Sequence, residues 1–161
     1  MSIEAKTGLV VVASHYESGG QRAEELMEAA VQSMKDRMVV PVVGSKTVWD
    51  AADAIDVCKE FKEQGVDSLT VILSTWVTDS LLYVLVHEMQ IPVVFWAVPY
   101  TETFSIGCVQ HFGSALTTHG IPYDYVYGLT DDKAAADKVA KIAEVGRIMK
   151  AVGNMKLALV G

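Results

Sequence analysis

The chain has 161 residues, of which 51% are hydrophobic and 20% charged, and its formal net charge is −7. This length predicts one domain, large enough to bury a real core without disulfide bonds, and the hydrophobic content excludes a disordered chain. The acidic balance argues against binding to nucleic acid or to anionic membranes, and the densest apolar run, residues 91–100, is too short to span a bilayer. Two cysteines, Cys58 and Cys108, are too few for a disulfide scaffold, so we expect reduced thiols and a cytoplasmic location.

The first part of the chain predicts a strand, a helix and a second strand. Gly8–Ala13 is a continuous, mostly β-branched run, which is typical of a strand buried on both faces. Apolar residues spaced three and four apart predict an amphipathic helix over Gln21–Arg37. Met38–Val43 is again strand-like, and because it contains Pro41 we expect it at an edge of the sheet.

The central part continues the alternation of helices and strands. Thr47 and Asp50 resemble a capping box, which predicts the start of a helix that ends near Gly65. A third strand follows over Ser68–Leu73. The segment Asp79–Met89 is almost wholly apolar, and its length favours a short helix over another strand.

The last part predicts two further strands, at Pro92–Val98 and Tyr123–Tyr127, with a helix over Ser105–His119 between them. Thr130, followed by two acidic residues, predicts the start of a long final helix, because carboxylates favour the positive end of the helix dipole. On its buried face we expect Val139, Ile142, Ala143, Gly146 and Met149.

Strands that alternate with helices predict an α/β fold, a three-layer doubly wound parallel sheet of flavodoxin-like or Rossmann-like type. The most economical strand order is 2-1-3-4-5. We assign residues 1–153 to this domain. The strand-like end Lys156–Gly161, within residues 154–161, predicts the start of a following domain, or alternatively a sixth strand at an edge.

Ligands of doubly wound sheets bind at the carboxyl ends of the strands, where the strand order reverses. Ser14 and His15 follow the first predicted strand, Thr75 and Trp76 follow the third, and Tyr100 follows the fourth. Aromatic faces together with hydroxyl and imidazole groups suit a neutral polyol, and the chain has no glycine-rich phosphate-binding motif. Two alternatives remain open: His15 bonds only a neighbouring loop, or Trp76 only closes the end of the sheet.

The other residues with chemical potential favour structural interpretations. Trp96 lies in an apolar strand and is predicted in the core, and Trp49, in the first turn of a helix, is predicted to pack or form an interface. The cysteines fall on apolar helix faces, as small buried side chains do. The histidines of the predicted helices do not form a metal site with any carboxylate pair; they are His87, His111 and His119.

Four stretches resemble the N-terminal domain of the L-fucose and L-arabinose isomerases and their relatives. They read GLVVVASHY, GVDSLTVILSTWVTDSLLYVLVHEMQIPVVFWAVP, TETFSIGCVQHFGSALTTHGIPYDYVYG and KLALVG. The resemblance implies a multidomain, oligomeric enzyme that interconverts an aldose and a ketose with a divalent metal, commonly manganese. It implies that the metal ligands and acid/base carboxylates lie in later domains, and that Ser14, His15 and Trp76 face the sugar. The L-arabinose enzymes carry Gln-His after the first-strand serine, where this chain has His15-Tyr16, so the sugar stays open.

We therefore expect the substrate-recognition and oligomerisation domain of an aldose–ketose isomerase. It would bind a small neutral sugar, contact the remaining domains and form a homo-oligomer, and it would hold no metal and no catalytic residue of its own. The alternative is a free-standing α/β module that binds a polyol or a partner protein. A third possibility is self-association through the apolar helix segment Leu81–Val86, if that segment is exposed.

Overall fold

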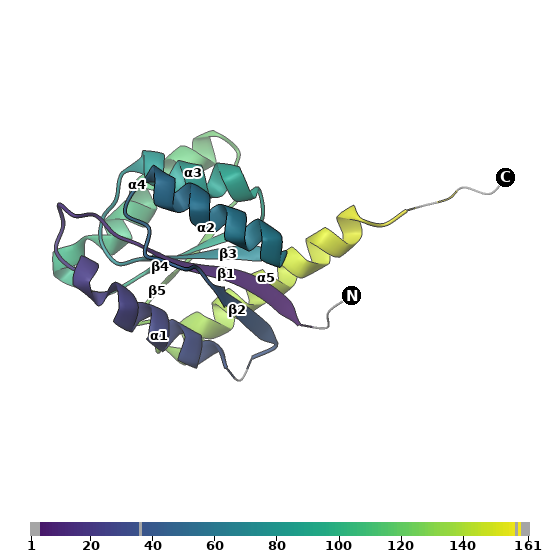
Figure 1. Ribbon diagram of the computed structural model, residues 1–161, viewed down its shortest axis with the longest axis horizontal. Coiled ribbons are helices and arrows are strands. Elements are labelled where there is room, and N and C mark those ends of the chain that lie inside the picture. The colour runs from purple at the N-terminus through teal and green to yellow at the C-terminus, as the bar shows by residue number, and fades with distance from the viewer. Residues whose placement is uncertain (1–3, 36, 157, 159–161) are drawn as a thin grey trace.

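Five parallel strands form one sheet in the order β2-β1-β3-β4-β5 in the computed structural model, which describes residues 4–35, 37–156 and 158 (Figure 1). The predicted α/β class and strand order are confirmed, and the arrangement is consistent with a flavodoxin-like or Rossmann-like fold. The strands are β1 (Ala5–Val12), β2 (Val39–Val43), β3 (Ser68–Leu73), β4 (Val93–Ala97) and β5 (Asp124–Tyr127).

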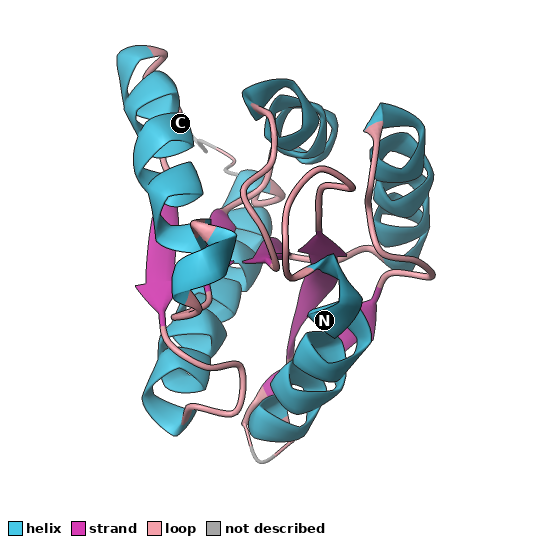
Figure 2. Ribbon diagram, turned by 90° about the vertical axis from the view of Figure 1, so that its left-hand side faces the viewer, coloured by secondary structure: helices cyan, strands magenta, loops and turns pink. Residues whose placement is uncertain are grey.

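Helices cover both faces of the sheet (Figure 2). The side chains of α1 and α5 pack against one face, and those of α2, α3 and α4 pack against the other. The helices are η1 (Gly20–Arg22), α1 (Ala23–Met34), α2 (Ala51–Gln64), α3 (Asp79–Met89), η2 (Thr101–Thr103), α4 (Ser105–Thr118) and α5 (Lys133–Gly153).

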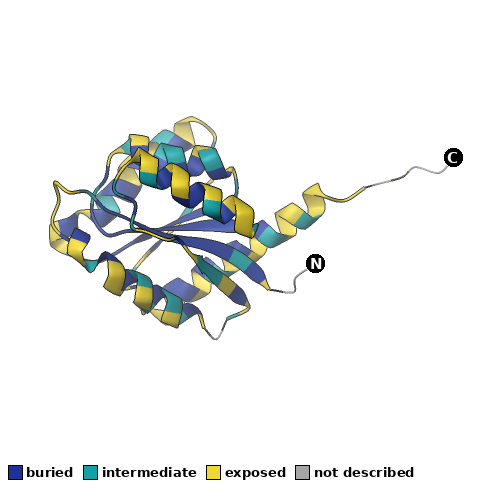
Figure 3. Ribbon diagram, viewed as in Figure 1, coloured by how far each residue is buried: buried dark blue, intermediate teal, exposed yellow. Residues whose placement is uncertain are grey.

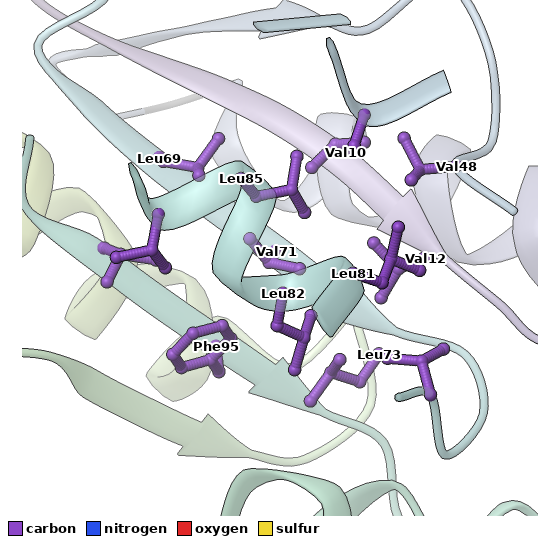
Figure 4. Packing of buried hydrophobic residues seen from close by; sticks show 14 of the residues in the cluster. Val10, Val12, Val48, Leu69, Val71, Leu73, Leu81, Leu82, Leu85 and Phe95 are labelled. Atoms are coloured by element: carbon purple, nitrogen blue, oxygen red, sulfur yellow. The ribbon is translucent and has the colours of Figure 1, made fainter. Parts of the chain in front are cut away.

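Two cores result from the alternation of side chains along each strand. Val10, Val71 and Phe95 point to the side of α2, α3 and α4 (Figure 4). Ile72 and Trp96 point to the side of α1 and α5, and Trp96 is fully buried, as predicted. All six residues of β3 are buried, because β3 lies in the middle of the sheet with helices on both sides.

The predicted boundaries of β3 and α3 match the structure residue for residue. Strand β1 begins at Ala5, three residues before the predicted Gly8, and α1 ends at Met34, before the predicted Arg37. Strand β2 pairs only with β1 among the described residues, so Pro41 does lie in an edge strand.

The predicted capping box at Thr47 and Asp50 is wrong in its register. Asp50 itself is the N-cap of α2, and its side chain accepts a hydrogen bond from the backbone N–H of Asp53. The Asp53 carboxylate in turn accepts a bond from the backbone N–H of Trp49 at 3.2 Å. The aspartate at the third helical position therefore accepts from the residue before the N-cap, whereas a capping box pairs the third-position side chain with the N-cap N–H itself, and Thr47 lies outside the cap.

The predicted buried face of α5 is correct for Val139, Ala143 and Gly146, whereas Ile142 is only half-buried. The prediction is wrong for Met149, which is 56% exposed. Its spacing fits the buried face, but this part of α5 extends beyond the end of the sheet (Figure 1). Of the predicted sixth strand Lys156–Gly161, residues 157 and 159–161 lie outside the described residues.

The apolar segment Leu81–Val86 of α3 is not an exposed surface. Leu81, Leu82, Leu85 and Val86 are all buried against the sheet and the neighbouring helices. The expected exposure of the segment is therefore wrong for these four side chains, whereas Tyr83 and Val84 are half-buried.

Candidate functional site

The carboxyl ends of β1, β2, β3 and β4 lie at one edge of the sheet, which we call the carboxyl rim and define as the loops 13–20, 44–50, 74–78 and 98–104. The chain leaves β1 toward α1 on one face and leaves β3 toward α3 on the other, so these two loops diverge at the rim. A switch of this kind is where doubly wound folds form ligand sites. All five residues predicted to bind substrate lie on these loops.

Hydrogen bonds join the loops that follow β1 and β3. The Thr75 hydroxyl accepts a bond from the backbone N–H of Ser14 at 2.8 Å and donates to the Trp76 carbonyl at 2.9 Å. The Ser74 hydroxyl donates to the Gly19 carbonyl at 2.7 Å. Ser74 and Thr75 are both buried, so their hydroxyls hold the loops in place and do not face the solvent.

Gly19 brings the loop that follows β4 into the same assembly. Its φ of 113° is accessible mainly to glycine. A Cβ at this position would lie 2.5 Å from Cγ2 of Thr103 and 3.0 Å from the Ser74 carbonyl oxygen. The backbone N–H of Trp76 also donates to the Thr103 carbonyl at 2.8 Å. Three loops are thus held together by hydrogen bonds and close packing, which makes the carboxyl rim a fixed scaffold.

His15 stacks on Trp49 at this rim. The ring centroids are 4.2 Å apart and the ring planes differ by 6°. The His15 side chain is otherwise exposed, whereas Trp49 is half-buried with its six-membered ring against Gly20. A Cβ at Gly20 would come within 2.7 Å of Trp49, so the glycine makes room for the indole.

Polar side chains surround the Trp49 side of this stack. An open pocket of about 550 Å³ lies between the start of α1 and the start of α2. Lys46 pairs with Asp53 at 3.3 Å and with Asp56 at 3.2 Å. The Lys46 ammonium donates hydrogen bonds to the Asp56 and Asp53 carboxylates, which raises the pKa of Lys46, and the bond from Lys46 lowers the pKa of Asp56. The pocket is lined by Gly20, Gln21, Ala23, Glu24, Lys46, Thr47, Trp49 and Asp53.

Trp76 and Tyr100 occupy separate neighbourhoods of the rim. Trp76 is half-buried against the core under α2, α3 and α4, and Tyr100 is half-buried against the core under α1 and α5. The Arg22 guanidinium lies 4.3 Å from the centre of the Tyr100 ring and pairs with Glu102. Within the described part of the chain, the aromatic contact of His15 is with Trp49.

Arg22 and Glu102 form an ion pair beside Tyr100. A backbone hydrogen bond at Glu102 and a second bond from the Arg22 guanidinium lower the pKa of the Glu102 carboxyl. One guanidinium nitrogen, Nη1, is buried without a hydrogen-bond partner among the described residues. The Arg22 guanidinium therefore packs against Tyr100 at the rim and is held there by Glu102.

The described residues do not fit a divalent metal. Residues 4–35, 37–156 and 158 contain no group of three or more histidine, cysteine, aspartate or glutamate side chains that could hold an ion. Both cysteines are buried as predicted, and burial raises the pKa of each thiol, Cys58 and Cys108, to about 11. In the same residues, no helix has the length and apolarity needed to cross a lipid bilayer.

Trp49 is the rim residue that sequence reasoning did not assign to binding. It follows Val48, which forms an isolated bridge with Val12 at the end of β1, and this bridge brings the indole beside the β1 loop. An aromatic residue directly before a helix cap is only a weak signal for such a position. No protein-family model matches the chain, and no curated protein matches its sequence.

Proposed function

We propose that the chain recognises a small neutral sugar at the carboxyl rim, as the substrate-recognition domain of an aldose–ketose isomerase similar to the L-fucose and L-arabinose isomerases. The observation that carries the proposal is the parallel stack of His15 on Trp49 beside a polar pocket. In this proposal the protein is cytoplasmic, and the reactive groups lie on other domains.

The chemistry of the rim suits a monosaccharide. The apolar C–H face of a sugar packs on aromatic rings, and its hydroxyls need several donors and acceptors placed close together. Lys46, Thr47 and Asp53 supply both kinds of group around Trp49. The pocket of about 550 Å³ lies within the range typical of small-molecule sites.

The residues predicted from the sequence have different parts in this proposal. His15 contributes its exposed ring, and Ser14 lies next to it on the same loop. Trp76 and Tyr100 shape the neighbouring stretch of the rim from two sides of the sheet. Thr75 acts indirectly, because its buried hydroxyl holds the Ser14 backbone.

Calorimetric titration with a panel of neutral aldoses and ketoses, L-fucose and L-arabinose included, tests the binding. We expect His15→Ala and Trp49→Ala each to weaken binding of the preferred sugar by at least tenfold. His87→Ala is the matched control, since His87 is an exposed histidine on α3 away from the carboxyl rim. Unchanged affinity in both rim variants, or no binding of any sugar, would contradict the proposal.

The alternative function is that of a free-standing module that binds a polyol. It is favoured because one chain contains both a hydrophobic core and a pocket. The same panel separates the two functions. Preference for an aldose together with its own ketose supports the isomerase assignment, and we expect the chain alone, supplied with Mn²⁺, to leave that pair unconverted. Binding of simple polyols such as glycerol, with no aldose or ketose bound, supports the module.

A further inference from the structure

The C-terminal half of α5 has an apolar surface that the described residues leave uncovered. Helix α5 has 21 residues, about 31 Å at 1.5 Å per residue, whereas the six residues of β3 span about 20 Å. Figure 1 shows this end of the helix projecting past the sheet, and Figure 3 shows it mostly exposed. Gly146 is the last buried residue on α5.

The exposed apolar residues here follow a regular spacing. Val145, Ile148 and Val152 of α5 are 50%, 47% and 59% exposed, and Met149 lies beside them. Met155, two residues past the helix end at Gly153, is 62% exposed. Intervals of three and four residues, from 145 to 148 and from 148 to 152, are those of a helix that packs against another helix. We call these five residues the α5 stripe.

A groove continues the α5 stripe onto the body of the domain. It has a volume of about 640 Å³ and lies at the amino end of the sheet, opposite the carboxyl rim. Val145 and Met149 belong to both the stripe and the groove. The facing wall comes from the segments that precede β4 and β5, where Ile91 and Ile121 line the groove. Stripe and groove therefore form one apolar surface.

We propose that this surface binds a second copy of the chain, with the two α5 helices antiparallel and the projecting end of each in the groove of the other. Such an interface is isologous, since stripe and groove lie on every copy and meet their counterparts by a two-fold rotation. Val145 of one copy would lie opposite Val152 of the other, and Ile148 opposite Met149.

The area is sufficient for a small specific interface. Five side chains that are about half exposed present on the order of 500 Å² of largely apolar surface. Two copies would therefore cover on the order of 1,000 Å² before the groove wall is counted, which is about the size that a biological interface must reach.

Light scattering coupled to size-exclusion chromatography, over a wide range of concentration, tests the assembly. We expect a concentration-dependent species of twice the 17.5 kDa chain. Ile148→Glu should raise the dimer dissociation constant at least tenfold. Ile55→Glu is the control, because Ile55 is an exposed isoleucine on α2, 39% exposed, and should leave the dimer intact.

Cysteine cross-linking tests the orientation. The double variant Val145→Cys/Val152→Cys should form a covalent dimer on oxidation, and Val145→Cys alone should not, because only the antiparallel pair brings residue 145 next to residue 152. Circular dichroism checks that each variant is folded. A monomer at every concentration, a dimer that Ile148→Glu leaves unchanged, or efficient cross-linking by Val145→Cys alone would each overturn the proposal.

Discussion

Gly146 of α5 lies directly against the backbone of Asp67, in the turn between α2 and β3. A Cβ on Gly146 would come 2.2 Å from the Asp67 carbonyl oxygen. One turn further along the helix, the Lys150 ammonium donates to the Gly65 carbonyl at 2.8 Å and to the Asp67 carboxylate at 3.0 Å. This contact sets how α5 is placed on the domain, and beyond it the helix leaves the sheet.

Gly146→Ala should destabilise the domain by about 1–3 kcal/mol, because the neighbouring atoms are backbone and cannot move aside cheaply. Gly153→Ala, on the same helix, is the control, since nothing lies within 4 Å of the added Cβ. It should be neutral or slightly stabilising. Urea unfolding of both variants measures the difference, and equal free energies of unfolding would contradict the close contact.

Gly19→Ala should cost about 3 kcal/mol or more, because a left-handed backbone and a collision with Thr103 act together. Gly120→Ala separates the two effects. Gly120 also has a positive φ, 68°, but its Cβ would meet open space, so strain alone should cost about 1–2 kcal/mol. Chemical denaturation compares the two, and a Gly19 variant no less stable than the Gly120 variant would argue against the packed loops of the carboxyl rim.

Ser105→Ala should cost about 1–3 kcal/mol, since the buried hydroxyl donates to the Leu73 carbonyl and accepts from the backbone N–H of Val98. It joins the ends of β3 and β4 at the base of the rim. Ser114→Ala, at an exposed position of the same helix, should change stability little. Thermal unfolding measures both, and two similar melting temperatures would count against this role.

Alkaline pH should weaken the fold through the two buried thiols. The pKa of each thiol rises from 9.0 to about 11 on folding. Below pH 9 the thiols are protonated in both the folded and the unfolded state, so their full contribution to the free energy of unfolding is present. Between pH 9 and 11 only the unfolded state loses the thiol protons, which costs at most about 2–3 kcal/mol per thiol. Melting temperatures from pH 8 to 11 should fall less steeply in a Cys58→Ala/Cys108→Ala variant than in the native chain, and parallel curves would refute this.

The fold could be predicted from the sequence because local signals agreed with the global arrangement. The β-branched strands, the amphipathic helices and the proline in β2 each favoured the same doubly wound sheet. Met149 was the exception on α5, because periodicity shows which face is apolar but not where the covering sheet ends. The apolarity of Leu81–Val86 likewise did not show that these residues were already covered.

The candidate site was less predictable, since it depends on contacts between loops. The fold rule placed Ser14, His15, Thr75, Trp76 and Tyr100 at one edge, but it does not say which side chains point outward. Thr75 turned inward to bond the Ser14 backbone. His15 met Trp49, 34 positions later in the sequence, through a bridge at the end of β1 that no local pattern indicates.

The interlocked turns around Gly19, Ser74 and Thr103 have a kinetic consequence for any molecule that docks there. Because the backbone is already in its final shape, little ordering entropy remains to be lost on association beyond the rotamers of a few exposed side chains. The association rate would then be limited by diffusion and not by the closure of a loop. Selectivity between ligands would come mainly from differences in their dissociation rates.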